Sequence, residues 1–173
     1  MPMLASSTLL GVALAVVARR QPAEAGAVSW LVIMGLLLTL IDWTCHRLPH
    51  ALVGVLLAGG VIQLGVTGLG SFDGAARLLQ AAMATAAVFV IAATMALVAP
   101  RGWGLGDVTL SATVAFFLGW FSWWHVAVGL FAAFALGALT FAVLRVRRAY
   151  RSGLLIPFGP ALVFASVTTI LLM

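Results

Sequence analysis

Long apolar stretches, with almost no charge to interrupt them, constrain this chain more than any other feature of its sequence. Hydrophobic residues make up 64% of the 173 residues, and charged residues only 8%. Average soluble domains are about 45–50% apolar and about 25% charged, so this chain has too few charged side chains to cover a water-facing surface. The sequence therefore excludes a soluble globular domain, a disordered chain and a disulfide-stapled module, and it favours an integral membrane protein.

Seven apolar runs follow one another along the chain, and buried strands do not explain runs of this length. About 20 residues cross a bilayer, so seven crossings use roughly 140 residues and leave little outside the membrane. We therefore expect an all-α, polytopic integral membrane protein with about seven transmembrane helices. The runs are Met3–Ala18, Ala27–Ile41, Ala51–Val66, Leu78–Val98, Val108–Trp120, Trp124–Leu144 and Leu154–Leu172.

The first apolar run has two interpretations. A secretory signal is one of them, but no positively charged residue precedes the run, so we interpret it as a retained helix. No loop between the runs is long enough for a soluble domain. We therefore expect a single membrane domain over residues 1–173, with an extra N-terminal helix and loop in 1–26 and a six-helix core in 27–173.

Arginine accounts for all nine basic side chains, and the net charge of the chain is +5. Alternating crossings place six arginines on one side of the membrane and three on the other, so the positive-inside rule makes the first side cytoplasmic. The orientation of the chain in the membrane thus accounts for its positive net charge. We expect membrane lipid but no nucleic acid as a partner. The six arginines are Arg47, Arg101, Arg145, Arg147, Arg148 and Arg151.

The tryptophans and the cysteine have structural interpretations. Trp30, Trp120, Trp123 and Trp124 fall at the outer ends of their runs, where tryptophan is typical of the membrane interface. The single cysteine, Cys45, excludes an internal disulfide and a four-cysteine zinc site. Since no cluster has metal-ligand spacing, we expect neither a metal nor another cofactor.

The chain has four acidic residues, and two of them occupy unusual positions. Glu24 and Asp73 fall in short loops, where we expect water to surround them. Asp42 ends the second apolar run and Asp107 begins the fifth, so both are expected at the same cytoplasmic boundary of the membrane. An ionisable group at that depth is costly and indicates a function.

Two carboxylates from different helices can activate one water molecule between them. Both do not ionise easily at close range, so one acts as a base and the other as an acid. The base takes a proton from water, which attacks a peptide carbonyl, and the acid helps the amine to leave. Three simpler roles stay open: Asp107 as a helix N-cap, Asp42 as the partner of an arginine, or both acids as a proton relay.

The residues around Asp42 and Asp107 are compatible with a site in which the backbone of a second polypeptide lies close to the two acids. Gly102, Gly104 and Gly106 precede Asp107, and glycines at this density let a second chain approach closely or form a tight loop. Pro49 suits the first turn of the helix that follows Asp42. A short ordered connection between Asp42 and Pro49 would then hold the side chain of Asp42 toward the interior of the protein.

Three motifs in this order resemble the prepilin peptidases, which are membrane aspartyl proteases of the GxGD type. The resemblance covers residues 28 to 172, which hold six of the seven runs. The order of the motifs and the expected position of both aspartates at one boundary match the family. The motifs are Asp42 followed by Leu48-Pro49, then Gly104-Leu105-Gly106-Asp107, and then Ile156-Pro157-Phe158-Gly159-Pro160.

The resemblance implies an activity, a substrate class and a set of site residues. Asp42 and Asp107 match the catalytic pair. The implied substrates are type IV prepilins, related pseudopilins and, for short members, Flp/Tad-type pilin precursors, which lose a basic leader at the cytoplasmic face of the bacterial inner membrane. The residues implied for substrate binding or backbone access are Gly104, Gly106, Pro49, Gly159 and Pro160.

Two features depart from the pattern of the family. Thr109 stands two residues after the second aspartate, where the family commonly has a lysine, and a cation there would favour the ionised aspartate. The chain also lacks the paired CxxC motifs of the bifunctional members, so we expect a peptidase without N-methyltransferase activity. The alternatives are an ion- or proton-coupled transporter and an inactive structural relative of the peptidases.

Overall fold

The computed structural model describes residues 22–45, 49–98, 104–146 and 158–173, and these form helices and short connections without a strand. The structure confirms the predicted all-α class. The first predicted run, Met3–Ala18, lies outside the described residues. The described helices are α2 (Ala25–Cys45), α3 (His50–Leu69), α4 (Gly74–Val98), α5 (Leu105–Phe121), α6 (Trp123–Val146) and α7 (Gly159–Leu172).

Four of these helices are long and apolar enough to cross a membrane, namely α2, α3, α4 and α6. The predicted count of about seven spans is therefore not confirmed in the described part of the chain. Helices α5 and α7 have only 17 and 14 residues. A helix of 17 residues is about 26 Å long, slightly less than the hydrocarbon core of about 30 Å.

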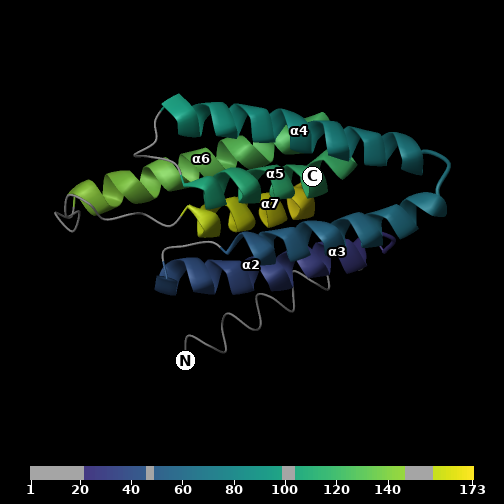
Figure 1. Cartoon of the computed structure of the whole chain (residues 1–173), viewed down its shortest axis with the longest axis horizontal. Helices are drawn as coiled ribbons and strands as arrows, with labels where there is room; N and C mark the ends of the chain where they lie inside the picture. Colours follow the sequence, from purple (N-terminus) through teal and green to yellow (C-terminus); the bar gives the residue numbers. More distant parts are fainter. Residues whose placement is uncertain (1–21, 46–48, 99–103, 147–157) are drawn as a thin grey trace.

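Helix α5 lies at the centre of the bundle, and every residue from Leu110 to Trp120 is buried. It packs against α3, α4, α6 and α7 and also contacts α2 (Figure 1). A helix that is enclosed on all sides has to be largely apolar, and beyond its first turn α5 carries no charged residue and only three hydroxyl side chains, Thr109, Ser111 and Thr113. The first turn of α5 is the exception, because it carries Asp107.

Glycines at the helix crossings let large side chains of one helix lie against the backbone of the next. Phe117 of α5 occupies the space where Gly60 of α3 has no side chain, and Leu118 does the same at Gly129 of α6. Small residues at helix contacts are the usual solution inside a membrane, because lipid offers no hydrophobic drive for helix pairing.

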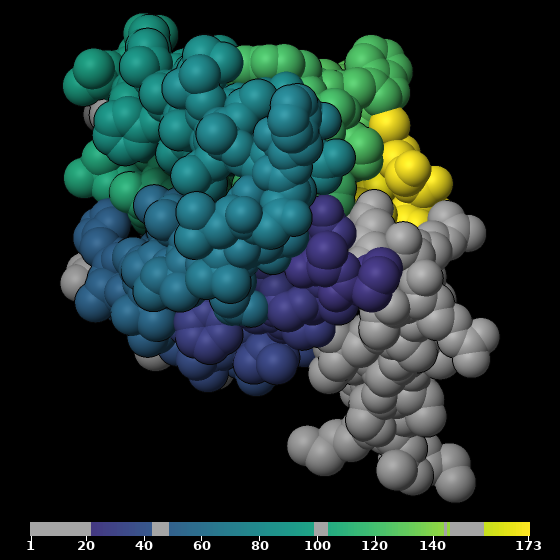
Figure 2. All heavy atoms as spheres, turned by 90° about the vertical axis from the view of Figure 1, so that its right-hand side faces the viewer, coloured from purple at the N-terminus to yellow at the C-terminus, as the bar shows by residue number. Residues whose placement is uncertain are grey.

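The charged residues that the structure describes lie at two opposite ends of the bundle. At one end, which we call the aspartate end, the C-terminal end of α2 meets the starts of α3, α5 and α7, at the left of Figure 1. At the other end, which we call the Glu24 end, the first residues of α2 lie beside the turn that joins α3 to α4. Figure 2 looks at this end and shows the purple start of α2 against the blue-teal turn.

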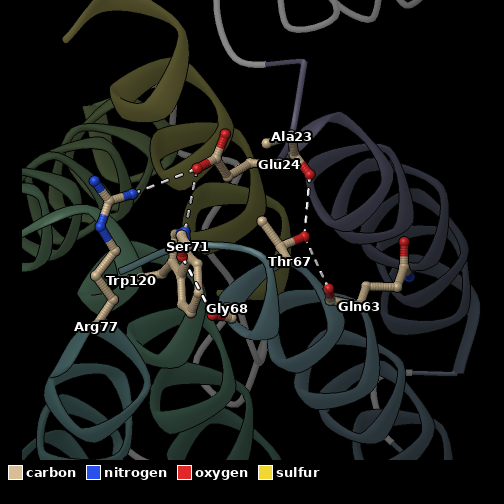
Figure 3. A network of polar contacts seen from close by, with 8 residues as sticks. All are labelled: Ala23, Glu24, Gln63, Thr67, Gly68, Ser71, Arg77 and Trp120. Atoms are coloured by element: carbon tan, nitrogen blue, oxygen red, sulfur yellow. Dashed lines mark hydrogen bonds and ion pairs between the residues drawn. The ribbon is translucent and has the colours of Figure 1, made fainter. Parts of the chain in front are cut away.

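Glu24 lies in a polar network and not in water, which corrects the prediction for this residue (Figure 3). Its side chain is only 13% exposed and forms an ion pair with Arg77 at 3.5 Å. The indole Nε1 of Trp120 donates a hydrogen bond to the same oxygen at 3.5 Å. The hydroxyl of Thr67 donates to the Ala23 carbonyl at 3.1 Å, so the network joins the residues just before α2 to α3, α4 and α5.

Trp120 also departs from its predicted place at the membrane interface. The side chain is fully buried, because the carboxylate of Glu24 gives its N–H a partner inside the bundle and Arg77 lies over its ring at 6.0 Å. Trp123 and Trp124 are exposed, as residues of an interface would be. Asp73 is exposed as well, as its position in a short turn predicts.

Candidate active site

Asp42 lies in the last turn of α2, and its side chain is buried, with 6% of the residue exposed. Its carboxylate fills the space in front of Gly159, the first residue of α7. A Cβ atom at position 159 would lie 2.9 Å from Oδ2 of Asp42 and 3.6 Å from Cδ2 of Leu110. Glycine is therefore required at this position if the carboxylate is to stay where it is. The contact joins the first and the third sequence motif.

Asp107 lies in the first turn of α5, half-buried, beside the glycines that precede it. The N-cap of α5 is Gly104, in extended conformation, and the backbone N–H of Asp107 donates to its carbonyl at 3.0 Å. A Cβ atom at position 104 would lie 3.5 Å from Oδ2 of Asp107, which is ordinary contact distance. The start of a helix is a favourable place for a carboxylate, because the helix dipole is positive there.

The two carboxylates lie close enough to interact electrostatically. Leu110 of α5 lies beside Gly159 together with Asp42, so α2, α5 and α7 converge at one place at the aspartate end. Two carboxylates that lie near each other on different helices can divide the roles of acid and base. The sequence predicted both residues at one boundary, and the structure places the last turn of α2 and the first turn of α5 at the same end of the bundle.

The structure also fixes the positions of the other predicted site residues. Pro49 is the N-cap of α3, and its carbonyl accepts hydrogen bonds from the N–H groups of Leu52 and Val53 at 3.0 and 3.3 Å. Pro160 lies in the first turn of α7, where its fixed φ suits a helix start. Gly106 is half-buried inside the first turn of α5. Pro157, Leu48 and Arg47 lie outside the described residues.

The start of α7 is held in place by an aromatic contact with α6. The ring of Phe158 lies 5.4 Å from the ring of Phe134. It also packs where Gly137 has no side chain, since a Cβ atom there would lie 2.8 Å from Cε2 of Phe158. Because Gly159 follows directly, this contact determines where the backbone of α7 meets the carboxylate of Asp42.

Ser111 belongs to the same helix face as Asp107 and was missed by the sequence reasoning. It lies one turn further along α5, is 3% exposed, and its hydroxyl has no hydrogen-bond partner within the part of the chain that the structure describes. A spacing of four residues from a candidate acid on a helix was the signal that could have identified it.

Thr109, which stands where the family commonly has a lysine, uses its hydroxyl within its own helix. It donates to the carbonyl oxygens of Gly106 at 3.0 Å and Leu105 at 3.2 Å. It therefore offers no positive charge to Asp107. Within the described residues, no group of three or more His, Cys, Asp or Glu residues lies close enough together to hold a metal ion.

Comparison with known proteins adds one finding. The sequence profile of the Type IV leader peptidase family matches residues 29–173 of this chain. The match includes both aspartates, the glycines of α5 and the start of α7, and it leaves out only the first four residues of α2 among the described helices. Neither a curated protein sequence nor a solved structure gives a significant match.

Proposed function

This chain belongs to the Type IV leader peptidase family, and we propose that it is an aspartic endopeptidase that uses Asp42 and Asp107. The proposed substrates are type IV prepilin-like or Flp/Tad-type pilin precursors. The proposed site of cleavage is the cytoplasmic boundary of a bacterial inner membrane. The observation that carries the proposal is the convergence of both carboxylates with the start of α7 at one end of the bundle.

The proposed reaction needs only water and the two carboxyl groups, which share one proton. The ionised carboxylate accepts a proton from water while the water oxygen forms a bond to the scissile carbonyl carbon. The protonated carboxyl group donates a hydrogen bond to the carbonyl oxygen, which becomes part of a tetrahedral intermediate. Transfer of a proton to the amide nitrogen then lets the C–N bond break, and a carboxylic acid and an amine leave the site.

The surroundings of the pair support an extended substrate. Gly104 is exposed and extended, so a peptide backbone can approach the oxygens of Asp107 without meeting a side chain. Asp42 is buried, which suits a carboxyl group that shares one proton with a neighbouring carboxylate. We include residues 27–173 in the proposed peptidase core, because the family match extends over nearly all of them.

Cleavage in membranes tests this function. A type IV prepilin is co-expressed with the native chain, with Asp42→Asn or with Asp107→Asn, and the leader is followed by gel shift and N-terminal sequencing. Asparagine keeps the shape of aspartate but removes the acid, so we expect both variants to lose cleavage at normal membrane levels. Asp73→Asn, an exposed acid in the α3–α4 turn, is the matched control and should cut like the native chain.

Each alternative predicts a different result. An inactive relative would leave every precursor uncut by the native chain. A transporter would also fail to cut, and it would bind or move an ion in a manner that depends on the two aspartates. Asp42 lies in the last turn of α2 and Asp107 in the first turn of α5, and both turns lie at one end of the bundle. This position favours the peptidase, because coupling sites of transporters typically lie near the midplane.

A further inference from the structure

The hydroxyl of Ser111 on α5 is buried, and its own helix does not bind it. The residue is 3% exposed, and Oγ has no hydrogen-bond partner among the residues that the structure describes. A hydroxyl on a helix can donate to a carbonyl three or four residues earlier. Its neighbours on α5 do so, since Thr113 donates to the Thr109 carbonyl at 2.9 Å and Thr109 donates to the Gly106 carbonyl at 3.0 Å. The Ser111 hydroxyl is therefore available for another partner.

A buried hydroxyl without a hydrogen bond destabilises a fold, so the serine at position 111 needs a reason. Size is not the reason, because Ala112 and Ala115 occupy buried positions of the same helix without a polar atom. An ordered water molecule is the usual partner of a buried polar group that protein atoms do not satisfy. Ser111 therefore has the properties of a residue that holds a water molecule inside the bundle.

The helical register places Ser111 beside the two aspartates. Residues four apart on a helix share one face, with Cβ atoms about 5–6 Å apart, so Ser111 lies one turn further along α5 than Asp107. Side chains on a helix lean toward its N-terminus, and the Ser111 side chain therefore leans over the turn that carries Asp107. Leu110 and the carboxylate of Asp42 both border the start of α7. The serine thus lies on the interior side of the aspartate pair.

One water molecule can bridge the space between Ser111 and Asp107. Oδ2 of Asp107 extends toward Gly104, 3.5 Å from where a Cβ atom of that residue would lie, and the serine makes no direct hydrogen bond to the carboxylate. Polar groups at such a separation are commonly joined by water. A buried water forms about three hydrogen bonds, and Ser111, Asp107 and the interacting carboxylate of Asp42 would supply three.

We propose that Ser111 is a positioning residue of the aspartate pair, whose hydroxyl donates to a buried water that donates in turn to the two carboxylates. This inference rests on the proposed peptidase function and adds a residue that supports the pair from the interior, whereas the substrate approaches from Gly104. A hydrogen bond to an ionised carboxylate favours that form, so Ser111 helps to keep one aspartate ionised. Thr109, with its hydroxyl bound within α5, supplies no cation for this purpose.

Few other titratable groups in the described part of the chain can disturb the pair. Helix α7 carries none, and His50 of α3 and Arg145 of α6 are exposed. Arg77 of α4 pairs with Glu24 at the opposite end of the bundle. A change in the pH dependence of a Ser111 variant therefore reports the aspartate pair.

The first experiment measures prepilin cleavage across a pH series with the native chain, Ser111→Ala and Thr113→Val. Thr113→Val is the matched control, because it removes a buried hydroxyl of the same helix that is bound to its own backbone. We expect Ser111→Ala to lower kcat about tenfold at unchanged KM, and to shift the acidic limb of the kcat profile about one unit to higher pH. The control should change neither. An unmoved acidic limb in Ser111→Ala would overturn the proposal.

The second experiment does not depend on cleavage. Infrared absorption of protonated carboxyl groups is followed against pH in detergent, and the bands that Asp42→Asn and Asp107→Asn remove are assigned to the pair. We expect Ser111→Ala to move this titration about one unit to higher pH, and Thr113→Val to leave it in place. If the hydroxyl held no water, its removal would raise Tm and leave the titration unchanged, which would refute the proposal. If the native chain cuts no prepilin, the peptidase function fails, and the titration still decides the role of Ser111.

Discussion

Replacing Gly159 by alanine tests whether the position of the Asp42 carboxylate controls catalysis. The new Cβ atom would lie 2.9 Å from Oδ2 of Asp42, whereas ordinary contacts begin near 3.4 Å, so the carboxylate or α7 has to move by roughly half an ångström. Leu110 lies 3.6 Å away on another side and limits where the helix can go. The backbone of Gly159 lies outside the left-handed region, so alanine causes no strain in φ.

The expected effect on activity follows from this displacement. Overpacking of a buried site costs about 1–3 kcal/mol of stability. A misplacement of about 1 Å in a catalytic group costs about a hundredfold in rate, so half of that displacement costs about tenfold. We therefore expect Gly159→Ala to reduce kcat about tenfold, with normal insertion into the membrane and a moderately lower Tm.

Initial rates of prepilin cleavage in detergent, together with thermal unfolding, provide the measurement. Gly65→Ala is the matched control, because a Cβ atom at that position would meet nothing within 4 Å and Gly65 lies outside the candidate site. We expect it to cut at close to the native rate. A Gly159→Ala variant with native kcat would refute the reasoning, since the carboxylate would then tolerate displacement without a loss of function.

Two further changes test the opposite end of the bundle and the departure from the family's pattern. Glu24→Gln removes the ion pair with Arg77, so Tm should fall by an amount equivalent to about 1 kcal/mol or less. The control, Asp73→Asn, should leave Tm unchanged. Equal Tm values for both variants would contradict a stabilising network around Glu24. Thr109→Lys places a cation near Asp107 and favours its ionised form, so the acidic limb of the cleavage–pH profile should shift to lower pH, which initial rates across a pH series would detect. Thr109→Gln, a long uncharged side chain at the same position, should leave that limb in place, and a shift with glutamine would assign the effect to size and not to charge.

Hydropathy alone predicted the helices of the core with good accuracy, because each described helix matches one apolar run. It placed some helix boundaries too early or too late. The predicted run Ala51–Val66 corresponds to α3, which extends from His50 to Leu69. The helix includes the polar residue Thr67, whose hydroxyl donates to the carbonyl oxygens of Ala23 and Gln63. The predicted span count is not confirmed, because α5 and α7 are shorter than 18 residues and the first apolar run lies outside the described residues.

The candidate site was predicted in part. The alternation of runs was enough to place Asp42 and Asp107 at one end, because each crossing reverses the direction of the chain. The contact of Asp42 with Gly159 required the three-dimensional arrangement, since those residues belong to the first and last helices of the core. The same holds for Glu24, whose partners Arg77 and Trp120 lie 53 and 96 residues away in the sequence.

The shortness of α5 has a consequence for how a hydrolase inside a membrane obtains its second substrate, water. Its 17 residues do not fill the thickness of the hydrocarbon core, and α6 extends well past the starts of α5 and α7 in Figure 1. The first turn of α5 is therefore recessed among longer helices. We expect this recess to hydrate Asp107 from the aqueous side, so that water reaches the scissile bond along protein surfaces without having to cross lipid.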